Sequence, residues 1–172
     1  MIVSDSTPLI YSAKLGYLTL LQKLFAKVNV PDEVMAEVMR GKQLGFGDAT
    51  VIEQAKQEGW IKVIKLNSVQ RRELLKLRRT FGDISEADAA AIVLAKSLGA
   101  NLCLDDSRAI KVAEVLGIKH IGTLGVLLLA VKKKLLSREH VKKLVLLLPE
   151  RGFYVSHDVL SEFLKQLEVL GK

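Results

Sequence analysis

The chain has 172 residues, of which 49% are hydrophobic and only three are proline, so it can bury the core of one ordinary domain. Lys and Arg (26) outnumber Asp and Glu (19), and the net charge of +7 favours a polyanionic partner such as nucleic acid. A single cysteine, Cys103, excludes an intramolecular disulfide and fits a reducing cytoplasm. The longest uncharged apolar stretch, HIGTLGVLLLAV, falls short of the roughly 20 residues that span a bilayer, so we expect a cytoplasmic protein without membrane contact.

Five short runs rich in Val and Ile predict β-strands, and a helical pattern follows each of them. The runs are residues 1–4, 27–30, 60–66, 101–104 and 119–122. Helices are expected at residues 8–25 with a break near Gly16, and at 31–40, 48–58, 69–79, 85–98, 107–116, 124–134, 138–148 and 158–170. Because parallel strands need crossover helices, this alternation predicts an α/β fold with an open parallel sheet and helices on both faces.

The C-terminal part differs from the rest, because three helical patterns and hardly any strand follow His120. We expect one domain over residues 1–172, with a core of about residues 1–136 and a helical extension of about residues 137–172. Gly41 is expected to end the helix that begins at Pro31. The glycine-rich stretch at residues 41–50 is the best candidate for a mobile loop.

Ligands of open parallel sheets bind beyond the carboxyl ends of the strands, so residues that directly follow predicted strands are the first candidates for a site. Asp5 follows the first predicted strand, and Asp105 and Asp106 follow the fourth. We expect Ser6 or Thr7 to cap the helix after Asp5, which leaves Asp5 available for another role.

Two predicted helices add further acids. Glu33 and Glu37 are four residues apart and share a helix face, and Glu33, in the first turn, is the better candidate for stabilising the helix dipole. Ser85 and Asp88 have capping-box spacing, so a capping role and a ligand role both stay open for Asp88. Glu86 and Asp88 point to different sides of their helix, so at most one of them faces a shared site.

Carboxylates that converge from separated segments repel one another unless a cation lies among them. Oxygen ligands select hard divalent ions such as Mg²⁺ or Mn²⁺, and the sequence has no His or Cys cluster that would favour zinc. One or two such ions can neutralise the charge that develops on a phosphodiester and activate a water for in-line attack. An acidic metal site in a basic protein therefore suits cleavage of a nucleic-acid backbone.

Four segments occur in the order VSDSTPLI, VPDEVMAEV, ISEADAAAIVLAKSLGANLCLDD and AEVLGIKHIGTLGVLLLAVKKKLL. Together they resemble the PIN-domain nucleases, in particular the prokaryotic branch akin to the VapC toxins of toxin–antitoxin pairs. The resemblance covers the whole chain and is strongest before residue 136. It implies an endoribonuclease that depends on Mg²⁺ or Mn²⁺, built as a three-layer α/β/α sandwich around a parallel sheet of four to five strands, with C-terminal helices.

The resemblance also implies which acids are catalytic and bind the metal. By position they are Asp5, Glu37, Asp88 and a fourth acid from the pair Asp105 and Asp106. The VapC-like pattern has a hydroxyl residue, one intervening residue and then Asp at the fourth place. Leu104 occupies the hydroxyl position here, which points to Asp106, but the departure leaves the choice of metal ligand between Asp105 and Asp106 open.

Two groups of basic residues are candidates for RNA contact, although such charges usually face solvent. One consists of Arg71, Arg72, Arg78 and Arg79, and the other of Lys132, Lys133, Lys134, Arg138, Lys142 and Lys143. Arg108 and Lys111 are better placed to meet a phosphate, because they come just after the acidic pair. RNA is the substrate that the resemblance implies.

The apolar helices at residues 124–148 allow two interpretations: they pack within the chain, or they form an interface for a homodimer or an antitoxin protein. Two other function classes also stay open. One is a non-catalytic RNA-binding or protein-interaction module on the same fold. The other is a Mg²⁺-dependent phosphoryl-transfer or receiver-like α/β protein, which is less favoured because Asp5 lacks a second Asp two residues on.

Overall fold

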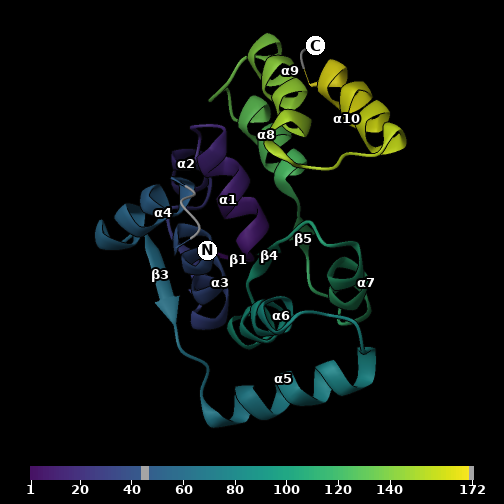
Figure 1. Ribbon diagram of the computed structural model, residues 1–172. Coiled ribbons are helices and arrows are strands. Elements are labelled where there is room, and N and C mark those ends of the chain that lie inside the picture. Colours follow the sequence, from purple (N-terminus) through teal and green to yellow (C-terminus); the bar gives the residue numbers. More distant parts are fainter. Residues whose placement is uncertain (44–46, 171–172) are drawn as a thin grey trace.

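A computed structural model describes residues 1–43 and 47–170 of the chain (Figure 1). Its five strands form one parallel sheet in the order β3-β2-β1-β4-β5. The strands are β1 (Ile2–Ser4), β2 (Val28–Pro31), β3 (Ile61–Ile64), β4 (Asn101–Cys103) and β5 (His120–Ile121). All five predicted strands are confirmed, and β1 lies at the centre of the sheet between β2 and β4.

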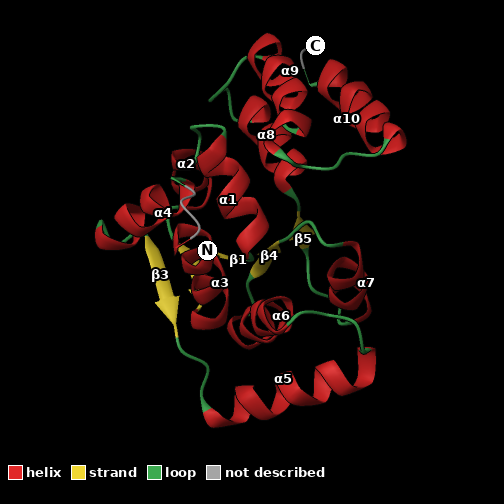
Figure 2. Cartoon of the chain, viewed as in Figure 1, coloured by secondary structure: helices red, strands yellow, loops and turns green. Residues whose placement is uncertain are grey.

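Helices cover both faces of the sheet, which confirms the predicted three-layer α/β/α fold (Figure 2). Parallel crossovers are right-handed, so connections that run toward β3 lie on one face and connections that run back toward β5 lie on the other. The first group is α1 (Ser6–Lys14), α2 (Thr19–Phe25), α3 (Asp32–Gln43) and α4 (Asp48–Gln57). The second group is α5 (Ser68–Phe81), α6 (Glu86–Leu98) and α7 (Ser107–Val115).

The most buried helix is α6, whose residues 87–95 are all buried. It contacts β1, β2 and β4 on one side and α5 on another. Six of these nine residues are alanine or aspartate, and such small side chains let the helix approach the sheet closely. The helix begins directly at the carboxyl edge of the sheet, so its first turn faces the ends of the strands.

The C-terminal helices form a second hydrophobic cluster at one end of the molecule (Figure 1). They are α8 (Thr123–Lys132), α9 (Arg138–Leu147), the short 3-10 helix at Pro149–Arg151 and α10 (His157–Val169). Leu20 of α2 joins Phe163 and Leu167 of α10 in this cluster. The Tyr17 hydroxyl shares a hydrogen bond with Nε2 of His140 on α9, which ties the first half of the chain to the C-terminal helices.

Two predicted boundaries are wrong. Pro31 is the last residue of β2 and pairs with Ile64, where its missing N–H costs no internal ladder bond. Gly41 lies inside α3, which continues to Gln43, because one glycine costs a helix only about 1 kcal/mol. The expected loop at 41–50 falls partly outside the described residues, since 44–46 are not described. Within the described residues, no helix combines the length and apolarity that crossing a membrane requires.

Candidate active site

Asp5 lies at the carboxyl end of the central strand, where its backbone N–H donates to the carbonyl of Cys103 on β4 (2.9 Å). The residue is only 3% exposed, and its Oδ1 has no hydrogen-bond partner. Burial raises the pKa of Asp5 to about 7, and the charges of Asp88 and Glu37 add to the rise. The backbone N–H groups of Ser6 and Thr7 act in the opposite direction. Asp5 is therefore a carboxyl group that is costly to ionise in the absence of a cation.

The cap of α1 differs from the prediction. The helix begins at Ser6, so the cap position is Asp5 itself, in extended conformation, and neither Ser6 nor Thr7 occupies that position. The Asp5 side chain accepts no capping hydrogen bond from the first turn of α1. Asp5 therefore takes the cap position while its Oδ1 has no hydrogen-bond partner, so this oxygen is available for another role.

Asp88 is held in the first turn of α6, beside the end of β1. It is 8% exposed, and Ser85 both donates from Oγ to Asp88 Oδ2 (2.7 Å) and accepts from the Asp88 N–H (3.0 Å). Burial raises the pKa of Asp88, the Ser85 hydrogen bond opposes this, and the charges of Asp106 and Glu37 raise the pKa further. The predicted Ser85 cap is confirmed, and the Ser85 hydroxyl orients the Asp88 carboxylate through Oδ2.

Glu37 lies half-buried on α3, and its charge repels those of Asp5 and Asp88. Its charge raises the pKa of Asp5 and of Asp88. Glu37 also lines a cavity of about 320 Å³ between α3 and the start of α6, together with Arg40 and Glu86. The structure thus brings three separated segments, β1, α3 and α6, to one acidic position at the edge of the sheet.

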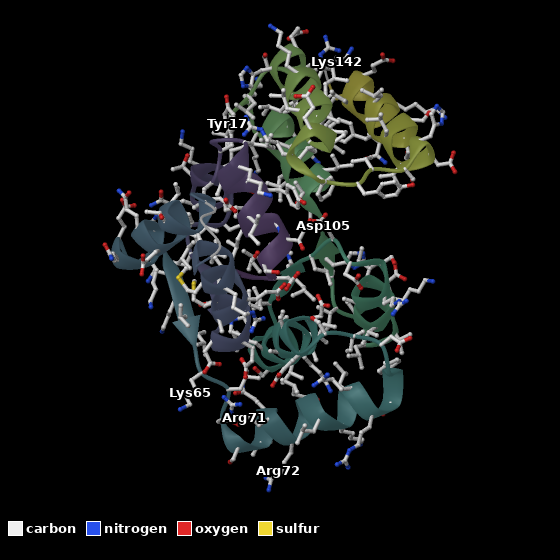
Figure 3. All side chains as sticks on the ribbon, viewed as in Figure 1. Tyr17, Lys65, Arg71, Arg72, Asp105 and Lys142 are labelled. Carbon is white, nitrogen blue, oxygen red and sulfur yellow. The ribbon has the colours of Figure 1, made fainter. Side chains whose placement is uncertain are left out.

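Asp105 and Asp106 are adjacent in sequence but are held differently. Both oxygens of Asp105 accept hydrogen bonds from Thr123, one from its N–H (2.8 Å) and one from its Oγ1 (2.5 Å). Burial raises the pKa of Asp105 and the two Thr123 bonds lower it. Gly122 makes this approach feasible, because a Cβ there would lie 2.6 Å from Asp105 Oδ1. Asp105 therefore fastens the start of α8, at the junction with the C-terminal helices (Figure 3).

Asp106 caps α7, and its charge acts on Asp88. Its Oδ1 accepts from the N–H groups of Arg108 and Ala109, both at 2.9 Å. Its charge is among the causes that raise the pKa of Asp88, whereas Asp105 is not. Of the two candidates for the fourth acid, Asp106 is thus the one electrostatically coupled to Asp88. The role of Thr123 was missed in the sequence, although a hydroxyl directly after the fifth strand was a usable signal.

Asp32 and Glu33, at the start of α3, form a separate ionic group with Arg71 of α5. Arg71 Nη1 lies 3.4 Å from Glu33 Oε1, and its Nη2 lies 3.7 Å from Asp32 Oδ2. Burial raises the pKa of Glu33. Figure 3 shows Arg71 near Lys65 and Arg72, at the α5 side of the molecule and far from Asp105. Arg71 is therefore engaged with protein carboxylates.

The acids fit a hard divalent ion in chemistry, although they do not form a closed cage. Asp5, Glu37, Asp88 and Asp106 offer only carboxylate oxygens, the donors that Mg²⁺ and Mn²⁺ prefer. The buried, unpartnered Oδ1 of Asp5 is an oxygen for which a cation would compensate. In the part of the chain that the structure describes, no three His, Cys, Asp or Glu side chains already converge closely enough to hold an ion.

Comparison with known proteins shows the family of the chain. The family model that matches this chain, over residues 1–169, is described as a PIN domain (DUF3368). No protein in the curated set matches it. Among solved structures, the crystal structure of PAE2754 from Pyrobaculum aerophilum is 16% identical, with a TM-score of 0.49, over 71% of this chain and 88% of that one.

Proposed function

Because the chain belongs to the PIN-domain family, we propose that it is a divalent-metal-dependent endoribonuclease that hydrolyses RNA phosphodiester bonds. PIN domains are generally nucleases and typically use divalent metal ions. One observation carries the proposal: Asp5 Oδ1 is buried without a hydrogen-bond partner while the charges of Asp88 and Glu37 act on the same carboxyl group. A cation beside these groups would remove both the desolvation cost and the repulsion.

Asp5, Glu37, Asp88 and Asp106 are the residues that would hold Mg²⁺ or Mn²⁺ in this proposal. When bound, the ion supplies the positive charge that neutralises a phosphodiester and lowers the pKa of water. The chain's own groups fix the acids: Ser85 orients Asp88, and the first turn of α7 holds Asp106. Asp105 contributes indirectly, by fastening Thr123.

RNA binding draws on the basic charge of the chain. Arg108 lies two residues after the Asp106 cap, is largely exposed, and pairs with Asp83 at 3.4 Å. An exposed pair of this kind is worth little, so the Arg108 guanidinium can exchange Asp83 for a phosphate at small cost. Lys111, one turn further along α7, is also exposed.

The proposal is tested by incubating the purified chain with single-stranded RNA in Mg²⁺ or Mn²⁺. We expect cleavage that EDTA abolishes and added Mn²⁺ restores, and that Asp5→Asn removes. Asp158→Asn is the matched control, because Asp158 is a fully exposed acid on α10. Thermal melts of both variants report folding. Cleavage by folded Asp5→Asn at the wild-type rate would overturn the site assignment.

The same assay separates the alternatives. A non-catalytic RNA-binding module would retain RNA binding in EDTA and cleave nothing in Mg²⁺. A phosphoryl-transfer or receiver-like protein would react with acetyl phosphate, and the proposal predicts no such reaction.

A toxin role, with an antitoxin as partner, extends the proposal. An apolar cavity of about 440 Å³ between α8 and α10, lined by Leu128, Val169 and Leu170 among others, is a surface that a partner protein or a second copy of the chain could cover. Induced expression in a bacterial host tests the role. We expect growth arrest with the wild type and normal growth with Asp5→Asn at equal protein levels.

A further inference from the structure

A third cavity, of about 570 Å³, opens beside the acidic site. On one side it is lined by Asp105, Asp106 and Ser107, at the end of β4 and the start of α7. On the other side it is lined by Phe153, Tyr154, Val155 and Ser156, which belong to the segment before α10. We call residues 152–156 the strap. Asp106 is thus shared between this cavity and the acidic group.

Tyr154 presents a large aromatic ring at this cavity. It is 89% exposed, the highest value for any large hydrophobic side chain in the described part of the chain. Ile110 and Val159 add apolar walls, and Ser107 and Ser156 add hydroxyl groups. An apolar surface with a few polar groups at its margin matches a nucleobase, which has a flat apolar face and a hydrogen-bonding edge.

The strap is fixed to α1, the helix that follows Asp5. The Tyr11 hydroxyl donates to the carbonyl of Gly152 (2.8 Å), and the Tyr11 and Phe153 rings meet edge to face with centroids 4.7 Å apart. Ser156 Oγ accepts from the Val159 N–H and caps α10 (3.3 Å). Tyr154 is therefore exposed on a segment that is anchored on both sides, so its ring is held near the acids without being buried.

The position of Tyr11 links the strap to the acidic edge. Burial raises the pKa of Tyr11, and the charges of Asp105 and Asp48 raise it further. The negative charge of Asp105 is thus felt at the residue that anchors the strap. A substrate strand whose phosphate reached Asp106 would bring a neighbouring nucleotide to Tyr154.

We propose that Tyr154 stacks on a nucleobase of single-stranded RNA beside the scissile phosphate, so that the cavity between the start of α7 and the strap is a base-binding subsite. This inference rests on the proposed function, because it takes the acids as the cleavage site. Stacking on an aromatic ring tolerates any base, since every base has a π-face. The subsite would therefore supply affinity and positioning with little sequence preference.

The first test couples Tyr154 to one base of the substrate. A single-stranded RNA that the wild type cleaves at one bond is compared with copies that carry an abasic nucleotide at successive positions. Loss of one stacked base is worth roughly tenfold. We expect a loss of about that size in kcat/KM for an abasic nucleotide next to the cleaved bond. Tyr154→Ala should show the same loss on intact RNA and no further loss on the abasic copy.

Tyr154→Phe should cleave like the wild type, because the ring and not the hydroxyl makes the contact. Leu146→Ala is the matched control, since Leu146 is an exposed apolar residue on α9 away from the cavity. Equal cleavage by Tyr154→Ala and wild type would overturn the inference. So would independent, multiplicative losses from the substitution and the abasic nucleotide, which would indicate a structural effect.

The second test does not depend on cleavage. The only native tryptophan, Trp60, is buried, so Tyr154→Trp adds an exposed fluorophore at the strap. Titration with poly(U) in EDTA should quench this added emission, and wild type should show little change. Quenching without cleavage under any metal would retain the subsite and reject the nuclease proposal. Cleavage without quenching would retain the nuclease proposal and reject the subsite.

Discussion

The two hydrophobic clusters of this molecule differ in what they bury. The sheet core encloses polar and charged groups, among them Ser4, Asp5 and Asp88, at the edge where the strands end. The C-terminal cluster of α8, α9 and α10 is built from apolar side chains such as Val141, Phe163 and Leu167. The core thus tolerates an unfavourable concentration of charge, whereas the C-terminal cluster is ordinary apolar packing.

The difference suggests a division of tasks within the proposed nuclease. Acids that repel one another need a rigid frame, and the buried helix α6 and the central strand β1 provide it. The C-terminal cluster holds no repelling acids, but it fixes the strap through the contact between Tyr11 and Phe153. Substitution of an acid at the edge of the sheet should therefore lower activity more than stability, and substitution in the C-terminal cluster should lower stability more than activity.

The largest expected effect is that of Asp88→Asn. Removing one charged oxygen ligand should lower kcat/KM on RNA by about a thousandfold, which corresponds to several kcal/mol of lost stabilisation of the transition state. The amide keeps the size of the side chain and removes a like charge beside Asp5, so the melting temperature in EDTA at pH 8 should rise. A fall in melting temperature together with intact cleavage would contradict the division of tasks.

Phe163→Ala should have the reverse signature. Truncating a buried Phe costs about 3–5 kcal/mol of unfolding free energy, while kcat/KM of the folded fraction on RNA should change little, because Phe163 contributes no group to the acidic site. Urea denaturation followed by circular dichroism measures the cost. Ile92→Ala, in the sheet core, is the comparison.

The same two variants test whether the chain is one domain. If residues 1–172 unfold as one unit, both variants keep a single transition with a lower midpoint. Two transitions in Phe163→Ala alone would show that the C-terminal cluster unfolds by itself.

The pH dependence of stability should reveal Asp5. Its pKa is about 7 in the folded state against 3.8 for the ordinary group, so between these values the folded state holds a proton that the unfolded state has released. Stability in EDTA should therefore fall as pH rises from about 4 to about 7, by up to about 4 kcal/mol. Asp88 and Asp105, whose pKa values are also raised, act in the same direction.

Urea denaturation across this pH range measures the effect. Asp5→Asn should flatten the profile, and Mn²⁺ added at pH 8 should restore stability to the wild type, because the ion binds only the native state. A wild-type profile with the same slope between pH 4 and pH 7 as that of Asp5→Asn would show that Asp5 ionises as freely in the folded state as in the unfolded state.

The smallest expected effect concerns the hydrogen bonds between Asp105 and Thr123, which connect the sheet core to the C-terminal cluster. Thr123→Val removes the Oγ1–H donor to Asp105 Oδ2 and leaves a buried carboxylate short of one partner, which costs about 1–3 kcal/mol. Thr80→Val is the control, because the Thr80 hydroxyl bonds only to the Lys76 carbonyl on an exposed helix. Equal melting temperatures for the two variants would show that the Thr123–Asp105 hydrogen bond does not stabilise the fold.

Periodicity in the sequence was enough to predict the order of strands and helices, because each element here is short and bounded by turn residues. The rule that sites lie at strand ends selected Asp5, Asp105 and Asp106 as candidates, without distinguishing Asp105 from Asp106. Periodicity could not predict that α3 passes through Gly41, since a helix tolerates one glycine when its other residues pack well.

The distinctions within acidic pairs depend on distant partners. Asp105 differs from Asp106 because Thr123, 18 residues away, donates to Asp105. Glu33 differs from Glu37 because Arg71 of α5 reaches Glu33. The place of Tyr154 likewise depends on Tyr11, which lies at the other end of the chain. Contacts of this kind have no local pattern, so only a three-dimensional structure reveals them.

The central position of β1 has a consequence for biosynthesis. Its neighbours are β2, formed by residues 28–31, and β4, formed by residues 101–103. A growing polypeptide emerges from the ribosome with its first strand unable to complete both pairings until β4 has been made. Asp5 follows β1 and Asp106 follows β4, so the edge of the sheet that carries both acids is complete only after β4 has been made.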